Sequence, residues 1–305
     1  MTSPSAAAAM PERAAAPDRL LAVDWSGRVD APGQRRHIWA ASWTPQRVAL
    51  DAGRTRHELA DWLILQAHRT PRMVVGFDFC FSFPAWFVHE TGAATAPAFW
   101  QMVADTHGEK WLHRDSADVR FWGRPKKKPL EFSGEHGHRM LRRTDVLSKV
   151  AAQISDPVRA AKVAGIAPKS VFQIGGAGAV GTASLRGFPT LLRLRQAGFR
   201  IWPFDAPSAN APLVVEIYTR LMTGPVVKSS TEARTSYLKN KAAEDPLYRS
   251  VPRSVLAKAR ASEDAFDALV SAMEMAAHRD QFARLQPASD PTTLLEGRTW
   301  VPGIA

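Results

Sequence analysis

Two short apolar runs, each ending on an aspartate, stand out in the first quarter of the chain. Leu20–Val23 precedes Asp24, and Met73–Phe77 precedes Asp78. Uninterrupted apolar runs of this length predict strands that are buried on both faces. Between these runs, the pattern predicts two more short strands over 37–43 and 47–50, joined by a turn at 44–46, and a helix over 55–68.

The pattern changes between about residues 84 and 170. This stretch is rich in Trp, His, Arg and Lys, and it contains the basic run Arg124-Pro125-Lys126-Lys127-Lys128-Pro129. It shows no strand pattern, but helices are expected over 96–105 and 145–153. We therefore expect an insertion that carries helices and a basic loop, not a separate domain built from strands.

Regular signals return in the last part of the chain. Apolar runs predict strands over 171–174, 199–202, 213–218 and 298–301, and apolar periodicity predicts helices over 182–197 and 262–278. The basic segment with Lys228, Arg234, Lys239 and Lys241 is expected to be a linker. Together these elements predict one α/β domain over 18–305, with a mixed central sheet and helices on both faces.

Composition restricts the class of protein. The chain has 305 residues, of which 45% are hydrophobic and 23% charged, as in ordinary globular proteins. No apolar run reaches the roughly 20 residues of a membrane-spanning helix. Residues 1–17 lack the apolar core of a secretion signal and are expected to form a disordered tail. The single cysteine, Cys80, excludes an internal disulfide and fits a reducing cytoplasm.

An excess of positive charge suggests a polyanionic partner. Forty Lys and Arg residues against 29 Asp and Glu residues give a net charge of +11. This excess alone leaves nucleic acid and a small phosphorylated substrate both open. The candidate phosphate contacts lie in the insertion; they are Arg124, Lys126, Lys127, Lys128, Arg142 and Arg143. The alternative is a basic loop that only meets solvent.

Acidic residues interrupt the apolar segments at positions suited to chemistry. Asp24 and Asp78 end strands, Glu216 lies inside a strand, and Asp264 and Asp267 share a face of the last helix. A buried carboxylate requires a cationic partner or a metal ion. Each acid also has a structural interpretation: Asp24 and Asp78 as turn formers, Glu216 as a partner of Arg220, and Asp264 as a residue that complements the helix dipole.

Taken together, the acid-bearing segments resemble a known family. The run Asp264-Ala265-Phe266-Asp267-Ala268-Leu269, followed by Ser271-Ala272, is similar to the final-helix motif of RuvC-type junction resolvases. This run with Leu21–Asp24, Gly76–Asp78 and Val215–Tyr218 resembles a family of unknown biological role described as predicted nucleases of RNase H fold. The segments Gly178–Thr182 and Leu185–Gly187 also look typical of that family.

The resemblance implies an RNase H-like fold and a metal-dependent nuclease. One or two Mg²⁺ or Mn²⁺ ions would be held by carboxylates and would promote hydrolysis of a phosphodiester in DNA or RNA. It implies that Asp24 bridges both metals, that Asp78 and Glu216 each hold one, and that Asp267 completes the set. Asp264 is the less certain ligand of its helix.

Other functions remain open. A phosphotransferase of the actin and sugar-kinase fold also begins with a strand that ends on Asp, although Asp24-Trp25-Ser26-Gly27 is a poor version of its turn. A non-catalytic nucleic-acid-binding protein is the third possibility. The glycines of Gly176–Gly181 fit the spacing G-x-G-x-x-G. They are compatible with a dinucleotide site, a phosphate cradle or a turn that admits a helix close to its neighbours.

Overall fold

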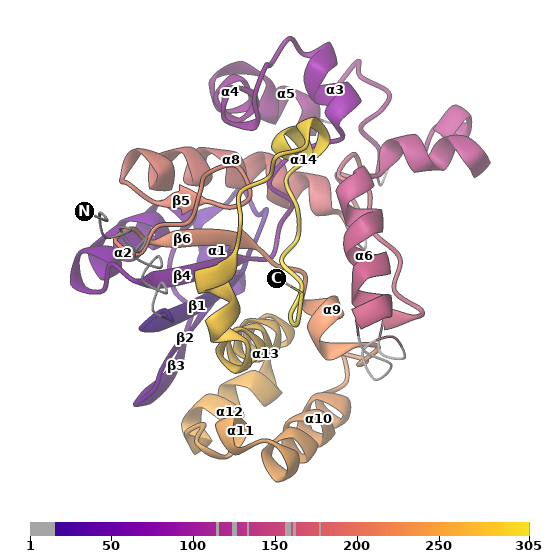
Figure 1. Cartoon of the computed structure of the whole chain (residues 1–305). Helices are drawn as coiled ribbons and strands as arrows, with labels where there is room; N and C mark the ends of the chain where they lie inside the picture. Colours follow the sequence, from indigo (N-terminus) through magenta and orange to yellow (C-terminus); the bar gives the residue numbers. More distant parts are fainter. Residues whose placement is uncertain are drawn as a thin grey trace, which may run out of the picture.

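A mixed six-stranded sheet forms the centre of the protein (Figure 1). The computed structural model describes residues 16–113, 116–123, 127–132, 134–155, 160, 163–176 and 178–304. The strands are β1 (Arg19–Asp24), β2 (Trp39–Thr44), β3 (Arg47–Asp51), β4 (Met73–Phe77), β5 (Arg200–Ile201) and β6 (Leu213–Glu216), in the order β3-β2-β1-β4-β6-β5. Strands β3, β2 and β1 pair antiparallel, while β1, β4, β6 and β5 pair parallel. This confirms the expected α/β class with a mixed sheet.

The register of the parallel strands brings their carboxyl ends to one edge. Val23 of β1 lies opposite Phe77 of β4, and Phe77 lies opposite Glu216 of β6. The amide of Asp78 continues this pairing by donating to the carbonyl of Val23 at 3.2 Å. Asp24 and Asp78 therefore follow neighbouring strands at the same edge of the sheet.

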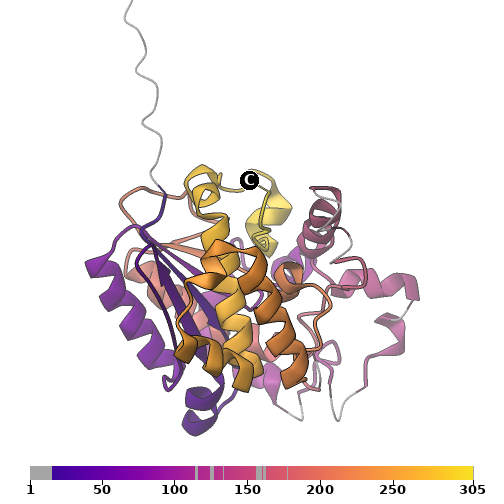
Figure 2. The same cartoon turned by 90° about the horizontal axis from the view of Figure 1, so that it is seen from below.

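Helices cover both faces of the sheet, as the alternation of buried side chains requires. Leu20 and Ala22 of β1 pack on the face of α13 (Glu263–Ala277), whereas Leu21 and Val23 pack on the face of α8 (Val180–Gln196). Helix α2 (Arg56–Arg69) shares the face of α8. Helices α10 (Thr231–Glu244) and α12 (Arg253–Ala261) lie beside α13, and Figure 2 shows them in orange in front of the sheet.

Eight further helices lie in the described part of the chain. They are α1 (Ala31–His37), α3 (Ala85–Glu90), α4 (Ala96–Met102), α5 (Gly108–Leu112), α6 (Arg143–Ser155), α9 (Thr219–Thr223), α11 (Pro246–Arg249) and α14 (Pro291–Glu296). A π-helical turn spans Val103–His107, and 3₁₀ turns span Leu130–Phe132, Gly134–Met140 and Arg279–Arg284. Across the part of the chain that the structure describes, no helix combines the length and apolar character needed to cross a membrane.

Several predicted elements are different in the structure. His37 ends a helix, because Asp30 caps α1 by accepting from the Gly33 amide and Pro32 favours the first turn. The segments 171–174 and 298–301 supply only single bridges, from Gln173 to Trp122 and from Thr299 to Glu216. The basic segment that was expected to be a linker contains α10, whose N-terminus is capped by Ser230.

The glycine cluster serves close packing. A Cβ on Gly181 would lie 2.1 Å from the carbonyl oxygen of Val171, so the backbones approach too closely for any side chain. The segment before the cluster is not a strand, because only Gln173 forms a bridge there. This geometry favours the turn interpretation over a dinucleotide site, which needs a strand at that point.

Candidate metal centre

Three of the predicted acidic residues meet at the carboxyl edge of β1 and β4. Asp24 ends β1, Asp78 follows β4, and Asp267 projects from α13. One carboxylate oxygen from each lies within 4.8 Å of the other two. The group of Asp24, Asp78 and Asp267 is called the carboxylate triad below.

Helix α13 positions the third carboxylate. Ser262 caps its N-terminus by accepting from the Ala265 amide, and Phe266, Leu269 and Val270 are fully buried between the helix and its neighbours. Asp267 lies among these apolar residues and is only 5% exposed. Because the docked helix fixes this side chain, the triad combines residues that are far apart in the sequence.

Lys228 supplies a positive charge to the triad. Its ammonium forms an ion pair with Oδ2 of Asp267. The other oxygen of this carboxylate, Oδ1, is buried and lacks a hydrogen-bond partner among the residues that the structure describes. One buried acceptor of the triad is therefore available to a further cation.

The pKa values of all three triad carboxyl groups are raised. Burial raises the pKa of Asp24 well above its usual range, and the charges of Asp267 and Asp78 raise it further. Burial, together with the charge of Asp267, raises the pKa of Asp78 to about 7. The pKa of Asp267 is also raised, because burial outweighs the attraction of Lys228. Such mutual repulsion is expected where carboxylates share a site that lacks enough positive charge.

A hydroxyl group orients the second carboxylate. Thr219, the first residue of α9, donates from Oγ1 to Oδ2 of Asp78 at 3.2 Å. The same hydroxyl lies 3.0 Å from Oγ of Ser271 on α13. These two contacts of the Thr219 hydroxyl link the Asp78 carboxylate and α9 to α13.

The donor set fits a hard divalent cation. Every candidate ligand in the triad is a carboxylate oxygen, which Mg²⁺ and Mn²⁺ prefer. The unpartnered Oδ1 of Asp267 adds a buried acceptor that a cation would satisfy. The residues present are therefore compatible with the metal that the sequence predicts.

Glu216, the fourth predicted ligand, lies outside the triad. Its Oε2 accepts from the Phe81 amide at 2.7 Å, and its Oε1 accepts from the Thr299 hydroxyl at 2.7 Å. Both oxygens also accept from the guanidinium of Arg142. The prediction that Glu216 shares this site is thus corrected: it is not a member of the triad, and its carboxylate forms an internal ion pair with Arg142.

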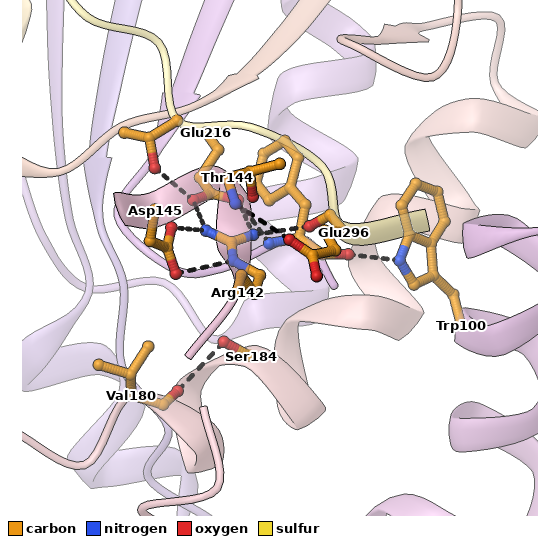
Figure 3. Close-up of polar contacts among 10 residues, drawn as sticks. Trp100, Arg142, Thr144, Asp145, Val180, Ser184, Glu216 and Glu296 are labelled. Atoms are coloured by element: carbon orange, nitrogen blue, oxygen red, sulfur yellow. Dashed lines mark hydrogen bonds and ion pairs between the residues drawn. The ribbon is translucent and has the colours of Figure 1, made fainter. Parts of the chain in front are cut away.

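Arg142 occupies the centre of this second polar group (Figure 3). It is fully buried, and its guanidinium bonds to Asp145, to Glu216 and to the backbone carbonyl of Glu296. The expectation that Arg142 contacts phosphate is therefore wrong, because no part of this side chain reaches the surface. Cys80 lies beside Asp145 and Glu216, but Arg142 already compensates these two charges.

Asp264 lies on the same helix as Asp267 but has a different environment. Its Oδ2 bonds to Nδ1 of His37 at 2.8 Å, and its side chain is 32% exposed. It is not a member of the triad. Its negative charge nevertheless contributes to the raised pKa of Asp24.

The remaining predicted phosphate contacts are either at the surface or outside the residues that the structure describes. Lys127, Lys128 and Arg143 are exposed. Arg124 and Lys126 lie outside the residues that the structure describes. Exposure leaves the three described side chains accessible to a polyanion.

A cavity of about 510 Å³ extends from Asp78 and Lys228 along the start of α8. Its basic lining residues are Lys149, Lys169, Arg220 and Lys228, and we call it the lysine pocket. The sequence singled out Lys228 only as part of a basic linker, and it gave no signal for Lys149 or Lys169. Neither lysine stands next to a motif. Both lie within the 84–170 insertion, and its folding brings them to the pocket.

Comparisons with known proteins add no relative. No protein-family model matches the chain, and neither a curated protein nor a solved structure gives a significant match.

Proposed function

We propose that the protein is a metal-dependent nuclease that hydrolyses phosphodiester bonds in nucleic acid, with Asp24, Asp78 and Asp267 as metal ligands. The observation that carries the proposal is the convergence of these carboxylates within 4.8 Å at one edge of the sheet. Their raised pKa values and the unpartnered Oδ1 of Asp267 are what a cation site without its cation exhibits.

The arrangement also supports the RNase H-like interpretation of the fold. The family resemblance rests on an acid that ends the first strand, a second acid that ends the strand after the first predicted helix, and acids on the last predicted helix. Asp24, Asp78 and Asp267 occupy those positions on β1, β4 and α13. The mixed sheet, with helices on both faces, is compatible with this fold.

Each residue of the site has a distinct task in this proposal. A bound Mg²⁺ or Mn²⁺ would activate a water molecule and stabilise the leaving oxygen of the phosphodiester. Asp24 and Asp78, held side by side by the pairing of β1 with β4, would anchor the cation at the sheet edge. Asp267 would complete the ligand set from α13, and Thr219 would keep Asp78 in its orientation.

The charge distribution favours a polyanionic substrate. The chain carries a net charge of +11, and four basic residues line the cavity that begins at Asp78. Lysine and arginine side chains contact the phosphates of nucleic acid and supply a large part of the binding free energy. The site therefore combines a place for the metal with a positively charged approach to it.

The direct test is hydrolysis of labelled DNA and RNA, in single-stranded, duplex and four-way-junction forms, by the full chain with Mg²⁺ or Mn²⁺. We expect metal-dependent cleavage that is lost in Asp24→Asn and Asp267→Asn. Asp18→Asn is the matched control, because Asp18 forms a surface pair with Arg72. ATP-dependent phosphorylation without cleavage would replace this proposal with the phosphotransferase alternative. Nucleic-acid binding without any cleavage would leave a non-catalytic nucleic-acid-binding protein as the remaining interpretation.

A further inference from the structure

The lysine pocket contains polar groups that the triad does not use. Lys149 projects from α6 and Lys169 from the segment before α8, and Arg220 is in α9. Within the described parts of the chain, none of the three forms an ion pair with an acidic side chain, whereas Lys228 in the same lining pairs with Asp267. Their charges are therefore available to an anion in the cavity.

A buried hydroxyl in the pocket also lacks a partner. Ser148 lines the cavity and is only 5% exposed, and its Oγ has no hydrogen-bond partner in the described structure. Unpartnered buried hydroxyl groups are rare in native proteins and indicate a ligand or a water molecule. Ser148 and Lys149 are adjacent in α6, and both line this cavity.

The start of α8 adds the positive end of a helix dipole at that place. Gly178, Ala179 and Val180 line the pocket, and no side chain caps the helix at Ala179. The first two amides of the helix are already bonded, since Val180 donates to the carbonyl of Gly178 at 2.9 Å and Gly181 donates to that of Gln173 at 3.0 Å. The helix therefore attracts phosphate through its dipole. Lys169 lies over this turn, with Cε 3.5 Å from the position that a Cβ of Gly178 would take.

Part of the pocket lining is apolar. Ile166 and Leu221 are buried, and the half-buried ring of Tyr218 packs against the same apolar cluster. A cavity of about 510 Å³ lies in the range of about 300–1,000 Å³ that is typical for small-molecule sites. A cavity that has both an apolar lining and basic groups suits a single nucleotide, whose base packs on the apolar residues and whose phosphate is held by the basic groups.

We propose that the lysine pocket binds one unpaired nucleotide of the substrate, with its phosphate at Ser148, Lys149, Lys169 and the start of α8. This inference rests on the proposed nuclease function and narrows its substrate to single-stranded nucleic acid or an unpaired strand end. A base in an intact duplex is stacked and paired, so it cannot enter a cavity of this kind without being extruded.

The test measures binding separately from cleavage. Fluorescence anisotropy with a labelled ten-nucleotide oligothymidylate, in EDTA, compares the wild type with Lys149→Ala/Lys169→Ala. We expect the wild type to bind the single strand roughly tenfold more tightly than a blunt ten-base-pair duplex. The double variant should lower the slope of log K against log salt by about 1.4, since each phosphate contact on a single strand contributes about 0.7. Lys110→Ala/Lys239→Ala removes the same charge from exposed positions outside the pocket and serves as the control.

A second variant blocks the cavity without a change in charge. Ala179→Trp fills the pocket at the start of α8 and should abolish single-strand binding, while the Mn²⁺-induced rise in Tm verifies folding and an intact triad. Equal affinity of the wild type for duplex and single strand, or full binding by either pocket variant, would overturn the proposal. A protein that binds single strands through this pocket but cleaves nothing would instead contradict the nuclease function alone.

Discussion

Lys228 and Asp267 form an ion pair in which the ammonium contacts only one of the two carboxylate oxygens. Oδ2 of Asp267 is the partner, while Oδ1 is buried and has no partner in the described structure. One ammonium therefore faces three neighbouring carboxylates. The triad retains excess negative charge whenever its members are ionised, which is the electrostatic condition for binding a divalent cation.

Removal of this ammonium should make the protein more dependent on metal. Lys228→Met is expected to lower the free energy of unfolding of the metal-free protein by about 3 kcal/mol, because it leaves a buried carboxylate uncompensated. The rise in Tm caused by Mn²⁺ should become larger than in the wild type, since the cation then relieves more repulsion. Thermal unfolding with EDTA and with Mn²⁺ measures both quantities.

Lys241→Met is the matched control for that variant. Lys241 forms a 3.0 Å ion pair with Glu274 of α13 that is buried to a similar degree but lies outside the triad. This control should lose stability without gaining metal response. If Lys228→Met behaved in the same way as Lys241→Met, the ammonium of Lys228 would have no connection with a cation site.

Neutralisation of Asp24 should separate catalysis from folding. Asp24→Asn removes one of three repelling charges, so the metal-free protein should be at least as stable as the wild type above pH 7. The stabilisation by Mn²⁺, about 2.7 kcal/mol at a concentration of 100 times Kd, should largely disappear, and hydrolysis should fall by orders of magnitude. A destabilised Asp24→Asn protein with the full metal response would make Asp24 a turn former instead.

The triad should also make metal-free stability depend on pH. Carboxyl groups whose pKa is raised in the folded protein bind more protons there than in the unfolded chain. Their contribution is complete below the unfolded pKa, near 4, and is lost as pH rises through the folded pKa, which is about 7 for Asp78. We therefore expect the Tm in EDTA to fall between pH 5 and pH 8, and Mn²⁺ to reverse the fall. The double variant Asp24→Asn/Asp78→Asn should flatten this profile, and an unchanged slope would contradict the assignment.

The Glu216 ion pair should contribute to the stability of the fold and not to the binding of metal. Glu216→Gln leaves the buried Arg142 with a single carboxylate, so unfolding should become easier by about 3–5 kcal/mol. The Mn²⁺-induced rise in Tm should remain. Glu58→Gln, in an exposed pair with Arg35, should change the stability far less. Loss of the metal response in Glu216→Gln would return Glu216 to the ligand set.

The basic run of the insertion should contribute to binding through phosphate contacts. Replacement of Lys126, Lys127 and Lys128 by Ala is expected to weaken nucleic-acid binding and to lower the salt slope by about 0.7–0.9 per lost contact. The Tm should hardly change, because Lys127 and Lys128 are exposed. Binding that is unchanged at every salt concentration would leave the run without a role in recognition.

The sequence predicted those parts of the fold that arise from local apolar patterns. Strands β1, β3 and β4 and helices α2, α8 and α13 lie close to their expected positions, since each has an unbroken apolar run or a clear helical stripe. The strand that was predicted over 171–174 was wrong, because apolar residues can be buried by packing alone, without a pairing strand. Helix α12 was missed because its amphipathic pattern is short and is interrupted by basic residues.

In the candidate site, too, the sequence predicted what local patterns carry and missed what tertiary packing brings together. Asp24, Asp78 and Asp267 were identified because each interrupts an apolar segment, which is a local signal. Glu216 has the same signal, but its partner Arg142 comes from the insertion, and no sequence pattern connects the two. Lys228 was hidden in a basic segment, because a single lysine carries no information about the carboxylate that it will contact.

The order in which the triad residues occur along the chain has a consequence during synthesis. Strands β1 and β4 leave the ribosome early, and their pairing brings Asp24 next to Asp78. Asp267 arrives only with α13, long after both strands have been made. A nascent or truncated chain that lacks α13 holds two carboxylates and no complete cation site. In the proposed nuclease, the complete set of metal ligands therefore exists only after α13 has been made and has packed onto the sheet.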